Sequence, residues 1–168
     1  SSLSPEEEWA RFEEAKEQAK EQLAGLYDKA LDEVGEDNAA IFEIHQMMLD
    51  DDDYLEAIKG IIDTQGATAE DATETTGENF SAAFAAMEDE YMRARATDVK
   101  DISRRVVNIL TGQGDAAMQD DKPAILVADE YLPSEVMDFD QRRLLGLITR
   151  KGSLDSHTAM LVRAYHIP

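Results

Sequence analysis

Apolar residues recur every three to four positions along most of the first 110 residues, a pattern typical of amphipathic helices. The first helix is expected to begin at Ser4, because a serine cap followed by proline, with glutamate three residues after the cap, is a helix start signal. It is expected to end at Gly35. Two shorter helices are predicted near residues 41–49 and 54–66.

A fourth, long helix is predicted to run from Thr68, its cap, to about residue 110, with Gly77 as the expected place for a bend. Two helical hairpins packed against each other would bury all four apolar faces. The sequence therefore predicts a helical domain over residues 1–112.

The pattern changes after residue 112. Residues 124–128 and 146–149 form short apolar runs typical of parallel strands, and helices are predicted after Pro133 and over 156–164. Strand and helix in alternation indicate an α/β layer over residues 113–168. Two strands do not make a stable sheet alone, so we expect further strands from outside this chain or a chain that is a piece of something larger.

Charge and composition exclude several classes of protein. The 168 residues carry a formal charge of −21, which disfavours nucleic acids and anionic membranes as partners. The absence of cysteine excludes disulfides and thiolate chemistry and suits a reducing cytoplasm. No apolar run reaches the length of a membrane span, so we expect a cytoplasmic protein with a basic or neutral partner.

The three histidines have different surroundings in the sequence. His157 follows a short polar loop and opens a helix, where free backbone N–H groups favour anions. From these features alone, a functional role and a plain helix-capping role remain equally open. His45 lies among apolar residues and is predicted to be a packed histidine, and His166 is predicted to be a surface residue.

Other candidate motifs do not meet their requirements. The acidic run 50–53 lacks the glycine and the closing glutamate of a calcium loop, and is predicted to be a solvated turn. No carboxylate pair with metal-ligand spacing stands near His157, so we expect no metal site in this chain.

The segment 152–163, Gly-Ser-Leu-Asp-Ser-His-Thr-Ala-Met-Leu-Val-Arg, resembles the phosphohistidine motif of Enzyme I of the bacterial phosphoenolpyruvate:sugar phosphotransferase system, commonly written Gly-Gly-x-Thr-Ser-His-x-x-Ile-x-Ala-Arg. The motif also fits pyruvate phosphate dikinase and phosphoenolpyruvate synthase. Residues 40–51, 98–102, 126–128 and 132–135 resemble Enzyme I in the family's order, so the resemblance runs from about residue 7 to residue 168.

The resemblance implies a mixed α+β and α/β fold: a four-helix, helical-hairpin subdomain joined to part of a swivelling phosphohistidine α/β subdomain. His157 would be the catalytic phosphoryl carrier, supported by Ser156, Asp155 and Arg163. Phosphate would pass from phosphoenolpyruvate to the histidine-containing phosphocarrier protein, the first step of sugar uptake. The resemblance further implies that this carrier docks on a surface formed by Glu36, Asp37, Met47, Met48, Asp51, Asp53 and Arg95.

The resemblance also implies that phosphoenolpyruvate and Mg²⁺ bind to a carboxy-terminal barrel outside this chain. On that view the chain is an amino-terminal fragment, itself monomeric, of a homodimeric enzyme.

The sequence departs from the family pattern near the histidine. Ser153 stands for the second glycine, Asp155 for threonine, and Val136 for a threonine that can hydrogen-bond the unreactive nitrogen of the active histidine. Either Asp155 orients the imidazole instead, or this member is slower or specialised. The alternative function is a catalytically silent, acidic helical docking or regulatory paralogue.

Overall fold

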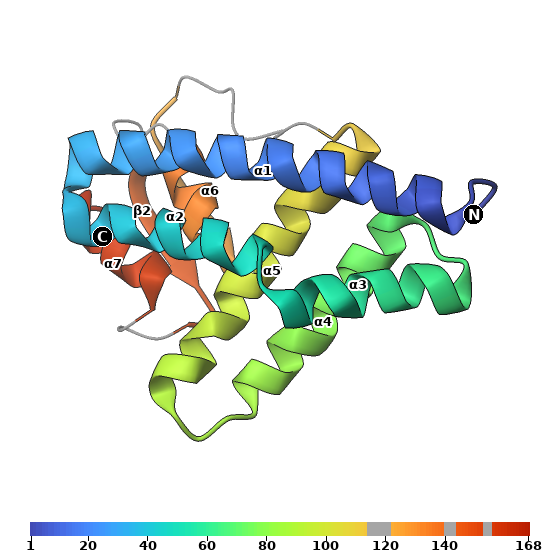
Figure 1. Cartoon of the computed structure of the whole chain (residues 1–168). Helices are drawn as coiled ribbons and strands as arrows, with labels where there is room; N and C mark the ends of the chain where they lie inside the picture. The colour runs from blue at the N-terminus through green and yellow to red at the C-terminus, as the bar shows by residue number, and fades with distance from the viewer. Residues whose placement is uncertain (114–121, 140–143, 153–155) are drawn as a thin grey trace.

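The computed structural model describes residues 1–113, 122–139, 144–152 and 156–168. Five helices form one part and a small two-stranded α/β layer forms the other (Figure 1). The helices of the first part are α1 (Pro5–Val34), α2 (Glu36–Leu49), α3 (Asp52–Gln65), α4 (Ala69–Ala85) and α5 (Glu90–Thr111). The second part contains β1 (Ala124–Ala128), α6 (Pro133–Asp138), β2 (Leu144–Thr149) and α7 (His157–Ala164).

The helix starts predicted at Ser4 and Thr68 are confirmed, whereas α2 begins at Glu36, five residues before the predicted start at 41. The Ser4 hydroxyl accepts a hydrogen bond from the Glu7 N–H at 3.1 Å, and the Glu7 carboxylate accepts one from the Ser4 N–H at 3.3 Å. This reciprocal pair satisfies backbone donors that the first turn leaves free. The Thr68 hydroxyl caps α4 in the same way, accepting from the Asp71 N–H at 3.1 Å.

The predicted long fourth helix is wrong, because the structure divides it into α4 and α5 with a turn at residues 86–89. No glycine or proline marks this turn. The signal is Asp89, whose carboxylate caps α5 by accepting from the N–H groups of Tyr91 and Met92. The two helices fold back as a hairpin, so the helical part has five helices where four were expected (Figure 1).

Gly77 is not a bend; it is where α4 and α5 approach each other closely. A Cβ placed on Gly77 would lie 2.6 Å from both the Cβ and the Oγ of Ser103 on α5. The Ser103 hydroxyl is itself held by the buried Tyr54 hydroxyl at 2.7 Å. Only glycine therefore fits at this position without moving one helix away from the other.

We predict that Gly77→Ala lowers the free energy of unfolding by about 1–3 kcal/mol, because the new methyl group forces α4 and α5 apart. Gly60→Ala is the matched control: it also lies inside a helix, but a Cβ there has no neighbour within 4 Å. Alanine at that position should stabilise by about 0.5–1 kcal/mol. Urea unfolding measures both changes, and equal effects of the two substitutions would contradict the close approach.

The main core joins the helical part to the α/β part. It combines apolar side chains from α1, α2, α3, α4 and α5 with Val136 and Met137 of α6 and Leu161 of α7. Figure 1 shows α6 and α7 lying beside α1, α2 and α5. The α/β elements are thus held against the helices by a shared apolar interior.

The two strands run parallel, as the sequence predicted, with Leu126 opposite Leu147 and Val127 opposite Ile148. Their apolar run is not fully buried, however: Ile125, Val127, Leu145 and Ile148 are 54–69% exposed. The far edge of β2 is also engaged, because the Leu147 N–H donates to the Pro168 carbonyl at 2.8 Å. Within the described residues, no helix is both long enough and apolar enough to cross a membrane.

Candidate active site

His157 is the first residue of α7, immediately after the capping residue Ser156. The Ser156 hydroxyl accepts from the Ala159 N–H at 3.1 Å, which fixes the start of the helix and with it the position of the imidazole. The His157 side chain is 23% exposed, so one side of the ring is packed and the other is accessible. The preceding residues 153–155, which include Asp155, lie outside the described residues.

The packed side of His157 meets a buried carboxylate of α5. The Oδ1 atom of Asp98 lies 3.0 Å from the Nδ1 atom of His157 and 2.8 Å from the Nε2 atom of His45. Asp98 is 1% exposed and His45 is fully buried. Residues from α2, α5 and α7 therefore converge on one carboxylate oxygen.

The charge state of Asp98 determines which ring nitrogens carry protons. Burial opposes ionisation and by itself raises the pKa of Asp98, but the hydrogen bonds from His157 and His45 outweigh it and lower the pKa to about 2. An ionised carboxylate only accepts hydrogen bonds, so the His157 Nδ1–H and the His45 Nε2–H must donate. In the neutral His157 ring, Nε2 then holds the free lone pair.

An open cleft of about 310 Å³ lies beside His157, between the first turns of α5 and the start of α7. Arg93 also lines it, paired with Glu90 at 3.5 Å, so the cleft holds one cationic and one anionic side chain besides the imidazole. Described residues that line the cleft are Glu90, Arg93, Ala94, Thr97, Gly152, Ser156 and His157. The cleft therefore leaves the accessible side of His157 open to a small group.

Polar contacts from α5 hold the α/β elements in place around this site. Asp101, one turn after Asp98, accepts from the N–H and the hydroxyl of Ser134 at the start of α6. Thr97 and Lys100 each donate to Glu130 at 3.3 Å. One helix thus positions both the histidine and the segment that leads into α6.

Two of the predicted supporting residues are placed by the structure, in different ways. Ser156 caps α7 and lines the cleft. Arg163 is exposed six residues further along α7, about 9 Å along the helix axis, and does not line the cleft. Val136 is buried in the core, and Asp98 now provides the contact to Nδ1 that the family threonine would make.

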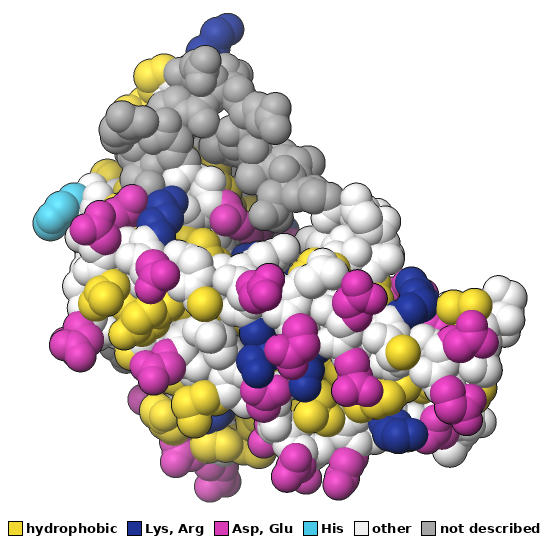
Figure 2. All heavy atoms as spheres, turned by 45° about the horizontal axis from the view of Figure 1, so that its top comes forward, with side chains coloured by type: hydrophobic (Ala, Val, Ile, Leu, Met, Phe, Trp, Pro, Cys, Tyr) yellow, Lys and Arg dark blue, Asp and Glu magenta, His cyan; other side chains and the backbone are white. Residues whose placement is uncertain are grey.

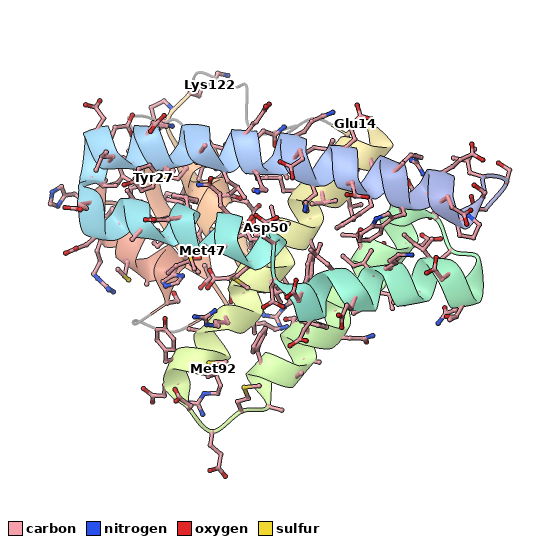
Figure 3. The ribbon with its side chains drawn as sticks, in the orientation of Figure 1. Glu14, Tyr27, Met47, Asp50, Met92 and Lys122 are labelled. Carbon is pink, nitrogen blue, oxygen red and sulfur yellow. The ribbon has the colours of Figure 1, made fainter. Side chains whose placement is uncertain are left out.

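The residues predicted to bind the carrier lie on α2, on the start of α3 and, for Arg95, on α5. Glu36, Asp37, Asp51 and Asp53 are exposed, Arg95 is partly exposed, and Met47 is 69% exposed. Figure 3 shows Met47 on α2, close to the turn that carries Asp50. Met48 corrects the expectation from the sequence: it is only 9% exposed and packs in the core, so it offers a partner little surface.

Acidic side chains are not confined to this region. Figure 2 shows them spread over the visible face, with apolar patches and a few basic clusters between them. One basic cluster links α1 to the end of α2. Lys16 and Lys20 of α1 both contact the Asp50 carboxylate, at 3.1 and 2.5 Å. These ion pairs fix the end of α2 next to the predicted docking surface.

The donor atoms gathered here do not fit Mg²⁺. Among the described residues, one group of three potential ligands is present, formed by His45, Asp98 and His157. It offers two imidazole nitrogens and one carboxylate, whereas Mg²⁺ prefers oxygen ligands in an octahedral arrangement.

Sequence reasoning missed Asp98 and the role of His45. The sequence offered one signal for Asp98. This residue lies with Val99, Ile102 and Val106 on the buried side of α5, where a charged residue is rare unless it has a partner. His45 is likewise a buried polar residue among the apolar residues of α2. Periodicity shows that each is buried, but not that the two meet, because they are 53 residues apart in the chain.

Comparison with known proteins identifies the class. Residues 1–95 match the family model described as "PEP-utilising enzyme, N-terminal", and residues 120–168 match "PEP-utilising enzyme, mobile domain". The first match covers α1 to α4 and the start of α5, and the second covers the α/β part. The chain belongs to the PEP-utilising enzymes.

Within that family, the similarity is to Enzyme I. The chain is 36% identical over 166 residues to the phosphoenolpyruvate-protein phosphotransferase of Bacillus sp. (strain S), and 34% identical over 164 residues to that of Bacillus subtilis. These alignments cover 97% of this chain but only 28% and 29% of the relatives, so the chain spans less than a third of their length.

Two solved structures have the same fold. One is described as an NMR solution structure of Enzyme I, with a TM-score of 0.74 and 31% identity, covering 98% of this chain and 66% of the other. The second is described as the N-terminal domain of "Enzyme 1 - Nitrogen", with a TM-score of 0.69 and 31% identity, covering 100% of this chain and 68% of the other. The predicted helical-hairpin and α/β arrangement is confirmed.

Proposed function

We propose that this chain is the phosphoryl-carrying amino-terminal region of a phosphoenolpyruvate-protein phosphotransferase. In this proposal, His157 accepts a phosphoryl group on Nε2 and transfers it to a histidine-containing phosphocarrier protein, the first step of sugar uptake by the phosphotransferase system. The observation that carries the proposal is the 3.0 Å contact between His157 Nδ1 and the buried Asp98 carboxylate, beside an open cleft.

The contact suits a histidine nucleophile. A neutral imidazole has one protonated and one unprotonated ring nitrogen, and a nucleophile needs the unprotonated one at the reacting atom. Asp98 fixes the proton on Nδ1, so Nε2 presents its lone pair. As the phosphorus–nitrogen bond forms, positive charge develops on the ring and the adjacent carboxylate stabilises it.

The proposed transfer needs no reacting group from this chain other than His157. The bond between phosphorus and the enol oxygen of phosphoenolpyruvate breaks, a bond from phosphorus to His157 Nε2 forms, and the enolate of pyruvate leaves and takes up a proton. In the second transfer, the bond to Nε2 breaks as the carrier histidine forms its own bond to phosphorus. Catalysis is then mainly a matter of positioning and charge.

Several parts of the proposal concern the longer protein. Phosphoenolpyruvate and Mg²⁺ would bind outside residues 1–168, because the donor set at His157 does not suit Mg²⁺. The chain itself would be monomeric, the longer enzyme a homodimer, and both cytoplasmic. The division of the chain into two domains between residues 112 and 113 also stays a prediction.

The carrier is proposed to dock, guided by charge, on the predicted docking surface, which lies on α2, the start of α3 and Arg95 of α5. We expect association to slow as salt is raised through about 0.15 M, where the screening length is about 8 Å, because the net charge of −21 attracts a basic carrier surface. Met47→Ala should raise the dissociation constant about 5- to 10-fold by removing exposed apolar contact. Val127→Ala is the matched control, since Val127 is also 69% exposed but lies on β1.

Titration calorimetry over a series of salt concentrations, with stopped-flow association rates, measures these effects. Binding that is indifferent to salt and equally weakened by the two substitutions would place the carrier elsewhere.

The function itself is tested by mixing the chain with carrier protein phosphorylated by radiolabelled phosphate. The expected result is a label on the chain that is acid-labile and alkali-stable, as phosphohistidine is, and that returns to added unlabelled carrier. A chain that binds the carrier but takes up no label would support the silent docking paralogue instead. Incubation with phosphoenolpyruvate and Mg²⁺ in place of the carrier should give no label.

A further inference from the structure

The buried group formed by His45, Asp98 and His157, the triad, has unused binding capacity. The three candidate ligand atoms lie within 4.8 Å of one another. Two further atoms, Nδ1 of His45 and Oδ2 of Asp98, are buried and have no hydrogen-bond partner. Buried polar atoms without partners are costly, and a bound ion is one way to satisfy the group that they belong to.

The chemistry of the triad matches transition metals. Two imidazole nitrogens and one carboxylate oxygen are the ligand set of many open Zn²⁺ sites, which leave a fourth position to water. Ligand atoms around a tetrahedral Zn²⁺ lie about 3.3 Å apart, given metal–ligand distances of about 2.0–2.1 Å. The observed separations of 2.8 and 3.0 Å between Asp98 Oδ1 and the two nitrogens would have to widen by a few tenths of an ångström. The two nitrogens lie within 4.8 Å of each other and would have to approach to about the tetrahedral separation as the metal binds.

A residue next to the triad also offers a hydrogen-bond acceptor for the second ring nitrogen of His45. A metal-bound histidine usually donates its second ring N–H to a carboxylate or carbonyl. With the metal on His45 Nε2, the His45 proton would sit on Nδ1, which lies 4.0 Å from Oδ2 of Asp101. The unpaired nitrogen would then gain a nearby acceptor.

We propose that the triad is a binding site for Zn²⁺ and chemically similar divalent transition metals, and that metal binding switches off His157 as a nucleophile. The ligands are Nε2 of His45, Oδ1 of Asp98 and Nδ1 of His157. When Nδ1 of His157 gives its lone pair to the metal, the ring proton moves to Nε2. No lone pair is then left at the atom that must attack phosphorus.

Each imidazole keeps one proton throughout, and no bond other than the metal–ligand bonds is made. The metal-binding part of the proposal stands on the geometry alone. The inhibition part rests on the proposed phosphoryl-transfer function.

The test of binding is calorimetric titration of the chain with Zn²⁺ in millimolar Mg²⁺, which occupies weak carboxylate sites on this acidic surface. We expect one Zn²⁺ per chain, and Co²⁺ in its place should give the visible absorption of a four-coordinate ion. His45→Gln should weaken Zn²⁺ binding at least about tenfold, the minimum that loss of a supporting partner costs at metal sites. His166→Gln, which changes an exposed histidine, should leave it unchanged.

His45 is fully buried, so circular dichroism must show that His45→Gln is folded. If it is not, nitrogen-15 NMR of the unmodified chain decides: Zn²⁺ must shift the ring signals of His45 and His157 and leave those of His166 in place. Binding that survives His45→Gln undiminished, or ring signals that do not move, would overturn the site.

The test of inhibition compares phosphate uptake from labelled carrier with and without one equivalent of Zn²⁺ already bound to the chain. Uptake should fall at least tenfold and recover when a chelator removes the metal. If Zn²⁺ binds but uptake is unchanged, the switch is wrong although the site stands. If the metal-free chain takes up no label either, the proposed function fails and the inhibition fails with it.

Discussion

His157→Gln is expected to reduce labelling of the chain by phosphorylated carrier to the background of the assay. Among the described residues that line the cleft, His157 is the one histidine, and glutamine removes its ring nitrogens. The glutamine amide can still hydrogen-bond Asp98 and so limits damage to the core. The variant should therefore remain folded and still bind the carrier. Gel electrophoresis with alkaline fixation detects the label, and mass spectrometry locates it.

His166→Gln is the control, since His166 is exposed near the carboxy end of the chain and makes no contact with Asp98. It should be labelled at the normal rate. A label that persists in His157→Gln, on whatever residue, would refute the assignment of the nucleophile.

Asp98→Asn is expected to slow phosphate uptake at least about 100-fold. The asparagine amide can donate to Nδ1 of His157, which favours the ring form with its proton on Nε2, and this form lacks a lone pair at the reacting nitrogen. The loss expected when a carboxylate no longer holds a catalytic histidine in the correct ring form is of this order or larger.

Asp101→Asn provides a matched control. Asp101 is a buried carboxylate on the same helix, but it holds Ser134 at the start of α6, not His157. Both substitutions should lower stability, whereas only Asp98→Asn should change the nitrogen-15 shifts of the His157 ring. Equal loss of activity in the two variants, with unchanged ring shifts, would show that Asp98 has only a structural role.

The helical part could be predicted well where a local signal exists. Local residues alone determine the helix caps at Ser4 and Thr68 and the helix end at Gly35. The structure has all three. The turn at residues 86–89 was missed because apolar periodicity continues through it and no helix breaker stands there. Gly77 was misinterpreted because a sequence does not show what a glycine faces.

The site was predicted in part. The loop-to-helix position of His157 is a local feature and could be found, together with Ser156 as its neighbour. Asp98 could not be assigned, because its role depends on a contact across 59 residues of chain. Met48 was placed on the docking surface by the family resemblance, together with Met47. Adjacent residues on a helix point about 100° apart, and this difference separates the exposed Met47 from the buried Met48.

The pairing of neighbouring helices described above also bears on the order in which the chain assembles. Contacts between α1 and α2 and between α4 and α5 join segments that are close in sequence, and such local contacts form quickly. The hydrogen bond from His157 to Asp98 closes a much longer loop and carries a larger entropic cost. The bond from His45 to Asp98 spans almost as many residues, 53 against 59. Both histidines are therefore expected to reach the carboxylate only after the neighbouring helices have paired.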